Sequence, residues 1–486
     1  MATPPLTIRN LTSTPLELVL LERFAPVSES ITTFKKLTRT LSGLTNFSTP
    51  ATPTSVQLAQ KSTSFTNTTL SLPIAPFTTQ VTDIDTPPDE TLRLTFLASG
   101  QRYRLTLPAP TSRSTTLVPL SPSPAHEFTS VYLTAYSHLS IYSSANLQSW
   151  MSHLPSALPL SALSIPGTHN SPTYRKALPS VRCQSVSVKT QLENGIRFLD
   201  IRVQPENAYD ASKEGLVLVH SAFPVALTGT KYFRQLVDTV LSFLEENPTE
   251  TVIMSVKREG IGRATDQHLS LILKEHYAHD TTRWFTENRI PTLGEARSKI
   301  ILLRRFATDD SLKAENDGRG WAVDAESWPD NTADGLCSSG EIRVQDFYEV
   351  AVHTNITKKI GFCEDHLGRA GRVIYPQHPQ SQAENENGTG REKGKEVPDP
   401  IFMNFLSASN FWRANCWPER VAEKVNPSIL EFLCRRHNEA AIHAEGEKRE
   451  VGDGSTGVVV CDWVGLNGDW DLVRCVVGMN ARLEIR

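Results

Sequence analysis

Short apolar runs alternate with segments of helical periodicity from about residue 150 to the end of the chain. Residues 233–244 carry apolar side chains at helical spacing and are followed by Pro248, which ends a helix. Residues 251–257 form a continuous apolar run, typical of a strand buried on both faces of a parallel sheet. The same pattern predicts a helix at 266–279 and strands at 299–306, 341–348, 401–405 and 457–462. Strands separated by helices predict an α/β fold with a parallel sheet.

Charged or imidazole side chains stand at the ends of these apolar runs. His169 follows residues 163–168, Arg202 ends a run that begins at 196, and His220 ends the run 216–220. No glycine-rich nucleotide loop follows the first strand, which argues against an open nucleotide-binding sheet. A TIM-like (β/α) barrel, regular or distorted, places the C-terminal ends of all its strands around one active site. The sequence therefore predicts an enzyme built on a (β/α) barrel.

The first 145 residues differ in composition from the rest. Between residues 41 and 82 the only charged side chain is Lys61, and Ser, Thr and Pro dominate, which favours loops and edge strands. Alternating apolar residues at 92–97 and 103–107 predict a hairpin, and residues 128–142 alternate again. We expect an N-terminal all-β domain at 1–145, with a sandwich as its architecture and no role indicated by the sequence.

The predicted barrel domain spans 146–486 and contains one polar insertion. Residues 377–398 are low in apolar side chains and are expected to be disordered. The chain has a formal net charge of -4 and a pI near 6.4, which give no general basic field for nucleic acid. No apolar run reaches the roughly 20 residues needed to span a bilayer, and no signal peptide is apparent at the N-terminus. These features predict a cytoplasmic protein and leave open peripheral contact with membranes.

Seven cysteines are scattered along the chain without a Cys-x-x-Cys pair. The sequence therefore indicates neither a disulfide framework nor a zinc site.

Five residues form the predicted catalytic group. His169 and His220 suit acid–base chemistry near neutral pH, and Arg202 offers a permanent fork of donors for phosphate oxygens. Asp200 and Asp462 are carboxylates that could orient an imidazole. Each residue also has a structural alternative, since either histidine could be a hydrogen-bonded structural residue and Asp200 with Arg202 an ordinary salt bridge. All five residues occur together on the predicted strands in this order, and this combination favours a catalytic site.

With these segments the chain resembles the phosphatidylinositol-specific phospholipase C X-domain family, and within it the bacterial-like, metal-independent branch. The resemblance covers roughly residues 150–486. It rests on Ser164-Ile-Pro-Gly-Thr-His169, Gly195-Ile-Arg-Phe-Leu-Asp-Ile-Arg202, and the segments 216–220, 252–257, 291–306, 345–348 and 458–463.

The resemblance implies a role for each predicted catalytic residue. His169 would be the general base for the inositol 2-hydroxyl, with its ring held by Asp462. His220 would be the general acid for the departing diacylglycerol oxygen, with Asp200 in support. Arg202 would stabilise charge on the phosphoryl oxygens.

The resemblance also implies five substrate-binding residues, the tyrosine stacking beneath the inositol ring: Asn170, Lys257, Arg305, Asp346 and Tyr348. In the calcium-dependent branch carboxylates stand at the positions of Arg202 and Lys257, where they bind the ion. Two cations replace them here, so no metal and no cofactor are expected.

Two positions depart from the pattern of the bacterial-like branch. Asn170 stands where its members usually carry aspartate, and Ser221 stands where the family often has glycine. Each of them directly follows a predicted catalytic histidine, so these departures bear on the rate and on the identity of the substrate.

The leading hypothesis is a hydrolase that cleaves a phosphoinositide or related phospholipid by intramolecular attack, with a cyclic phosphate as product. One alternative is a weak or inactive module that binds a lipid headgroup, although a pure binding role has no need of both imidazoles. Another is a phosphodiesterase for a different glycerophosphodiester, which would use calcium held by carboxylates; the cation at position 202 argues against it.

Overall fold

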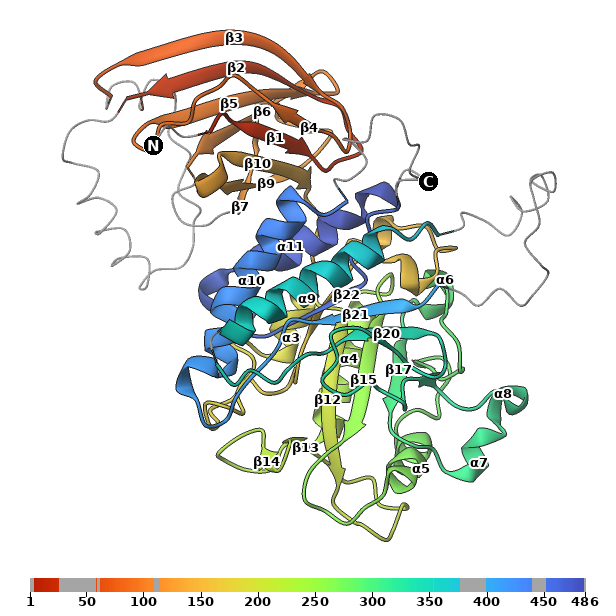
Figure 1. Ribbon diagram of the computed structural model, residues 1–486. Coiled ribbons are helices and arrows are strands. Elements are labelled where there is room, and N and C mark those ends of the chain that lie inside the picture. Colours follow the sequence, from red (N-terminus) through yellow and green to blue (C-terminus); the bar gives the residue numbers. More distant parts are fainter. Residues whose placement is uncertain are drawn as a thin grey trace, which may run out of the picture. The chain divides into compact units, whose positions relative to one another are not determined.

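The chain divides into two compact units, Met1–Ser144 and Ala145–Arg486. A computed structural model describes residues 4–25, 58, 62–108, 114–352, 354–375, 399–438 and 452–484 (Figure 1). The predicted insertion at 377–398 lies outside these described residues.

Two five-stranded sheets make up the regular structure of the first unit, apart from one 3-10 turn, η1 (Thr134–Tyr136), as far as its residues are described. In spatial order, the first sheet contains β4 (Thr79–Val81), β1 (Thr7–Asn10), β10 (His138–Ser143), β9 (Phe128–Leu133) and β7 (Ser114–Thr116). The second contains β3 (Phe65–Ile74), β2 (Leu16–Phe24), β5 (Thr91–Ala98), β6 (Gln101–Leu107) and β8 (Val118–Pro119).

Side chains from both sheets share one apolar core. Ile8 and Leu139 of the first sheet lie in the same buried cluster as Leu18 and Phe96 of the second. The predicted hairpin is confirmed, since β5 and β6 pair in antiparallel fashion from Ala98–Gln101 outward. The two turn residues, Ser99 and Gly100, have φ of 47° and 76°, as a two-residue hairpin turn requires.

A curled, mostly parallel sheet forms the centre of the second unit (Figure 1). Its main path runs through β16 (Trp284–Phe285), β17 (Ile300–Arg305), β15 (Val252–Arg258), β12 (Phe198–Pro205), β11 (Ile165–Thr168), β22 (Val458–Cys461), β21 (Ile401–Phe405), β20 (Ile342–Gln345) and β19 (Gly335–Leu336). All the pairs on this path are parallel except β19 with β20. β18 (Val323–Asp324) pairs with β17.

The inner face of this sheet encloses a single core. Ile165, Phe198, Ile253, Ile301 and Val344, from five different strands, belong to one buried apolar cluster. Side chains from strands so far apart in the sheet can meet only if the sheet curls around them. No ladder joins β20 to β17 in the described residues, so the barrel is open at that seam. The predicted barrel is therefore present in a distorted form.

Helices connect most of these strands: α3 (Val188–Glu193), α4 (Phe233–Glu246), α5 (Asp266–His276), α6 (Leu293–Ala296), α7 (Asp310–Lys313), α8 (Glu315–Gly318), α9 (Thr354–Gly371), α10 (Pro418–Arg435) and α11 (Asp471–Gly478). Short 3-10 turns are η2 (Trp150–His153), η3 (Leu160–Ala162), η5 (Ala414–Cys416), η6 (Leu466–Gly468) and η7 (Met479–Arg482). Helix α4 shows why these segments are helical, because its apolar stripe, including Phe233, Val237 and Val240, is buried. Among the described residues, no helix is both long and apolar enough to cross a bilayer.

The strand that carries His220 differs from the prediction. β13 (Leu216–His220) pairs in antiparallel fashion with the end of β12 and then with β14 (Phe223–Pro224). Only residues 206–215 separate β12 from β13, whereas a parallel crossover needs about a dozen residues or more. The expectation that His220 ends a parallel barrel strand was therefore wrong, and His220 reaches its position on a returning hairpin.

Candidate active site

The predicted catalytic residues come from neighbouring strands of the barrel. His169 directly follows β11 and Asp462 directly follows β22, its partner in the sheet. Asp200 and Arg202 lie within β12, on the other side of β11. Parallel strands present their C-terminal ends at the same edge, which brings these residues together.

His169 is held on three sides. Its Nδ1 lies 2.9 Å from Oδ1 of Asp462. Its backbone N–H donates to Cys461 and its carbonyl accepts from Gln184. Burial raises the pKa of Asp462 above its ordinary value, while His169 and Arg202 act in the opposite direction. With an ionised Asp462 accepting from Nδ1, the lone pair of the neutral ring lies on Nε2, and His169 can take up a proton there.

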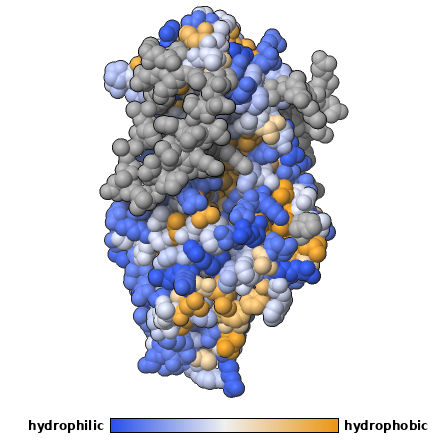
Figure 2. Space-filling model, turned by 90° about the vertical axis from the view of Figure 1, so that its left-hand side faces the viewer, coloured by the Kyte–Doolittle hydropathy of each residue, from blue (hydrophilic) through white to orange (hydrophobic). Residues whose placement is uncertain are grey.

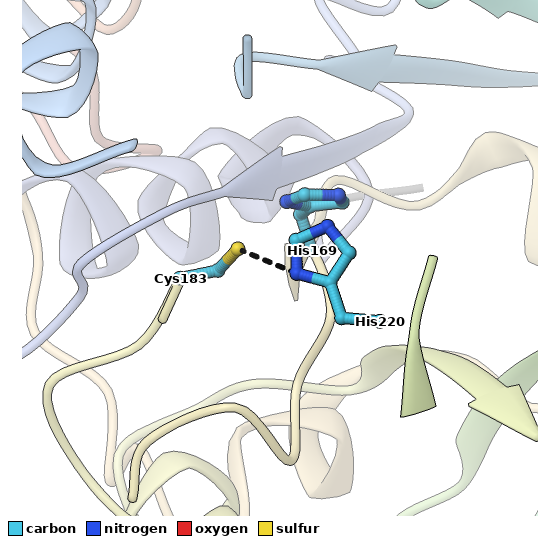
Figure 3. A group of neighbouring side chains, drawn as sticks. All are labelled: His169, Cys183 and His220. Carbon is cyan, nitrogen blue, oxygen red and sulfur yellow. Dashed lines mark hydrogen bonds between the residues drawn. The ribbon is translucent and has the colours of Figure 1, made fainter. Parts of the chain in front are cut away.

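His220 faces His169 at nearly a right angle. The two ring centres are 5.9 Å apart with an interplanar angle of 89°, and both rings lie beside Cys183 (Figure 3). Nδ1 of His220 is 2.8 Å from the carbonyl oxygen of Val181, which can only accept. Burial, with the positive charge of Arg202, lowers the pKa of His220 to about 4. In the free protein His220 is therefore neutral at pH 7, with its proton on Nδ1 and its lone pair on Nε2.

Arg202 bridges two carboxylates, the buried Asp200 and the partly buried Glu259. Its guanidinium donates to Oδ2 of Asp200 at 3.2 Å and to Oε1 of Glu259 at 2.9 Å. Burial opposes ionisation of Asp200, but Arg202 and Arg305 outweigh it and hold the pKa of Asp200 well below its ordinary value. Asp200 also accepts from the backbone N–H of Asn170 at 3.0 Å. The result is a fixed guanidinium beside the two imidazoles.

Glu259, which no sequence motif indicated, completes this network. Oε1 of Glu259 also lies 3.1 Å from Nζ of Lys257, and Oε2 accepts from the backbone N–H of Ser221 at 2.8 Å. Burial opposes its ionisation, but Arg202 and Lys257 lower the pKa of Glu259 to about 2. A signal existed, because residues two apart on an extended strand point to the same side, and Glu259 is two residues beyond Lys257.

The predicted substrate-binding residues are distributed over several strands. Arg305 ends β17 and donates to Asp200 at 3.3 Å, and its guanidinium carbon lies 3.7 Å from the ring centre of Trp328. Trp328 in turn donates from Nε1 to Asp346 at 3.0 Å. Trp328, also missed from the sequence, thus joins two predicted residues. It lies on a long connection whose sequence has no periodic pattern from which its path could be predicted.

Tyr348 is oriented by the preceding loop. Its hydroxyl donates to Asp330 at 2.8 Å, and its backbone N–H donates to Asn331 at 3.0 Å. Burial, together with the hydrogen bond to Asp330, raises the pKa of Tyr348 to about 12. The phenol therefore stays neutral and offers a ring face.

The two residues that depart from the family pattern both have left-handed backbones. Asn170 has φ of 43° and Ser221 has φ of 52°. Asparagine tolerates this region well and glycine adopts it freely. The Ser221 side chain is exposed, and its backbone contributes the N–H bound to Glu259.

Comparison with known proteins points to one family. Residues 156–306 match the family model of the phosphatidylinositol-specific phospholipase C X domain. The chain is 35% identical over 181 residues to a 1-phosphatidylinositol phosphodiesterase of Listeria monocytogenes, a match covering 35% of this chain and 53% of that protein. It is 25% identical over 359 residues to the protein of the same name from Staphylococcus aureus, covering 71% of this chain and 97% of that one. The match thus spans about half of the first relative and nearly all of the second.

Solved structures give a corresponding similarity. A phosphatidylinositol-specific phospholipase C from Staphylococcus aureus aligns with a TM-score of 0.49 and 20% identity, covering 69% of this chain and 97% of that chain. The Listeria monocytogenes protein aligns with a TM-score of 0.46 and 20% identity, covering 69% and 99%.

Proposed function

We propose, on the premise that residues 156–306 are a phosphatidylinositol-specific phospholipase C X domain, that this chain is a phosphodiesterase that cleaves phosphatidylinositol or a close relative. One observation carries the proposal. Two imidazoles face each other at 5.9 Å, one of them paired with a buried carboxylate, and an arginine anchored by two further carboxylates belongs to the same cluster. A protein that only binds a headgroup needs no such pair of proton-transfer groups.

In the first step Nε2 of His169 removes the proton from the inositol 2-hydroxyl. The freed oxygen attacks phosphorus, and the bond from phosphorus to the diacylglycerol oxygen breaks. Asp462 stabilises the imidazolium that forms, across the 2.9 Å contact. The products of this step are diacylglycerol and a cyclic inositol phosphate.

His220 supplies the proton that the leaving diacylglycerol oxygen needs. Because its pKa is near 4 in the free protein, it acquires this proton only with help from the substrate. The phosphodiester carries a negative charge, and an anion beside the ring raises the pKa of a histidine. Binding of the substrate thus prepares the acid. Water can later open the cyclic phosphate with the two histidines in exchanged roles.

Arg202 stabilises the charge that grows on the phosphoryl oxygens. Asp200 and Glu259 hold its guanidinium in place before the substrate arrives, so little reorganisation is needed. With Lys257 beside it, the site already contains fixed cations, and we propose that no metal ion is required. Asn170, Lys257, Arg305, Asp346 and Tyr348 would bind the inositol ring.

An exposed aromatic cluster supports peripheral contact with a membrane. Phe223, which pairs with His220 in the β13–β14 hairpin, stacks on Phe411 at 5.6 Å, and Phe411 contacts Trp412. Trp412 is 88% exposed and Leu227 is 58% exposed. Figure 2 shows apolar surface in the lower half of the face that it draws. Such side chains next to the site would enter the interfacial layer that holds the substrate.

Co-sedimentation with phosphatidylinositol vesicles tests this contact. Trp412→Ala should shift the chain to the supernatant, whereas Leu336→Ala, which alters an exposed leucine on β19, should not. Equal sedimentation of the two variants would show that Trp412 is not part of the membrane contact.

We also infer that residues 1–145 form a separate all-β sandwich and that the barrel at 146–486 carries the catalysis.

The product of the reaction tests the proposed function. Phosphorus NMR of phosphatidylinositol vesicles with the full chain should show a cyclic inositol phosphate before any open-chain phosphate. Phosphatidylcholine vesicles serve as the control that should not be cleaved, since choline has no hydroxyl beside the phosphate that could attack it. An open-chain product first, or equal cleavage of phosphatidylcholine, would contradict intramolecular attack. Vesicle binding without turnover would instead favour the headgroup-binding module.

A further inference from the structure

Cys183 is a buried residue beside both histidines to which the proposed reaction gives no role. Its sulfur is 3.9 Å from Nδ1 of His220, and its backbone N–H donates to Thr173 Oγ1 at 3.1 Å. Figure 3 shows the sulfur and the two imidazoles converging from three separate parts of the chain. One nitrogen of each histidine and the sulfur lie within 4.8 Å of one another. The loop between β11 and α3 therefore brings a third donor to the pair.

We propose that a zinc ion binds between His169, Cys183 and His220 and reversibly inhibits the enzyme. Imidazole nitrogen and thiolate sulfur are the ligands that zinc prefers, at about 2.0–2.1 Å and 2.3 Å respectively. The Cys183 thiol gives up its proton to water as the ion binds. In a tetrahedral site these bond lengths place the donor atoms roughly 3.3–3.6 Å apart. The donors here are within 4.8 Å of one another, so they must approach by about 1.5 Å at most to close the site. Calcium and magnesium prefer oxygen ligands and would not compete.

The surroundings of His169 suit a metal ligand. Asp462 lies 2.9 Å from Nδ1, so Nε2 is the nitrogen that would bind the ion, in place of its long 3.5 Å contact with Nδ2 of Asn170. A carboxylate that accepts from the second nitrogen of a metal-bound histidine fixes the orientation of the ring. The pairing that prepares His169 as a base thus equally prepares it to bind zinc.

His220 needs one change. Its Nδ1, the nitrogen nearest to the sulfur, is bonded to the carbonyl oxygen of Val181 at 2.8 Å. Zinc would either replace this single hydrogen bond or bind Nε2 after the ring turns. The guanidinium of Arg202 repels a cation, and three ligands leave a fourth position for water. Both features make the site weaker than a structural zinc site, which fits reversible inhibition.

The inhibition follows from the positions of the donors. A bound ion would occupy the lone pair on Nε2 of His169, the atom that takes up the proton in the proposed reaction. This consequence depends on the proposed function, whereas binding of the ion does not.

Cobalt titration of the full-length chain tests the binding alone. Thiolate ligation to cobalt gives a strong charge-transfer band in the near ultraviolet, which zinc should abolish by competition. The band should appear in the wild type and in Cys416→Ser, a variant at a buried cysteine outside the group, and be lost in Cys183→Ser. Cys183→Ala, which buries no new polar group, should agree. No band in the wild type, or an unchanged band in both Cys183 variants, overturns the proposal.

Zinc titration of phosphatidylinositol cleavage tests the consequence. Without metal, Cys183→Ala should turn over like the wild type, and it should need at least about tenfold more zinc for half inhibition. EDTA should restore the wild type. Equal sensitivity of the two proteins overturns the role of Cys183. If no protein cleaves the lipid, the proposed function fails, while the cobalt band still decides the metal site.

Discussion

Asp462→Asn isolates the contribution of the carboxylate to the chemistry of His169. The side chain of Asp462 is 2% exposed, and its Oδ1 lies 2.9 Å from Nδ1 of His169. Its Oδ2 is buried and has no hydrogen-bond partner among the residues that the structure describes. Asparagine has nearly the same shape, so the substitution opens no cavity. It does remove the negative charge and replace one acceptor by a donor.

The substituted amide has two orientations, and both impair the base. If its oxygen faces His169, the NH2 group occupies the unpartnered position of Oδ2. If the NH2 group faces His169, it donates to Nδ1, and the proton of the ring moves to Nε2, where it blocks uptake of another. A hydrogen bond to a charged group contributes roughly 1.5–3 kcal/mol, which corresponds to about 10–150-fold in rate. Because the tautomer adds to this loss, we expect kcat to fall by about 100-fold or more with little change in KM.

Initial rates of inositol phosphate release from phosphatidylinositol vesicles measure this effect. Asp471→Asn is the matched control, since Asp471 is also a buried aspartate of the barrel unit but begins α11. It should keep the wild-type kcat. Urea unfolding of both variants checks that the fold persists. A kcat for Asp462→Asn within about threefold of the wild type would refute the assigned role of Asp462.

Three further predictions concern a buried ion pair, the charge state of His220 and the anchor of Arg202. Arg197→Met leaves the fully buried Glu250 without its cationic partner at 2.9 Å, so urea titration should show a loss of about 3–5 kcal/mol in unfolding free energy; a loss below about 1 kcal/mol would contradict this. His220 has a pKa of about 4 against an ordinary value of 6.5, so the unfolded chain takes up this proton first as the pH falls below 6.5. Between pH 7 and pH 4.5, His220→Asn should therefore lose roughly 2–3 kcal/mol less stability than the wild type, and equal losses would show that His220 is not held neutral. Glu259→Gln weakens the anchor of Arg202, so kcat/KM should fall about tenfold or more with an unchanged circular dichroism spectrum; a smaller fall would make Glu259 dispensable.

Periodicity and strand ends predicted much of this molecule. Continuous apolar runs located the parallel strands, because such strands are buried on both faces. His169 and Asp462 follow neighbouring strands, so they could be placed at one edge before any contact was known. The β5–β6 hairpin was readable because its alternation is broken by a short turn.

The positions of residues on irregular loops could not be predicted from periodicity. Cys183 reaches His220 through the irregular loop between β11 and α3, and Trp328 reaches Arg305 from another irregular connection. Neither loop has a repeating pattern that predicts its path. The direction of β13, in contrast, could have been predicted from the sequence. The ten residues between β12 and β13 are too few for a parallel crossover, so they indicate a hairpin.

Turnover of phosphatidylinositol vesicles in the presence of excess EGTA tests most directly whether fixed cations and two imidazoles are sufficient. Wild type, His169→Ala and His220→Ala would be compared at equal concentration, with release of inositol phosphate as the readout. We expect undiminished wild-type activity in EGTA and a loss of about 1,000-fold or more in each histidine variant. Activity that disappears with EGTA and returns with calcium, or that survives in either variant, would contradict this account.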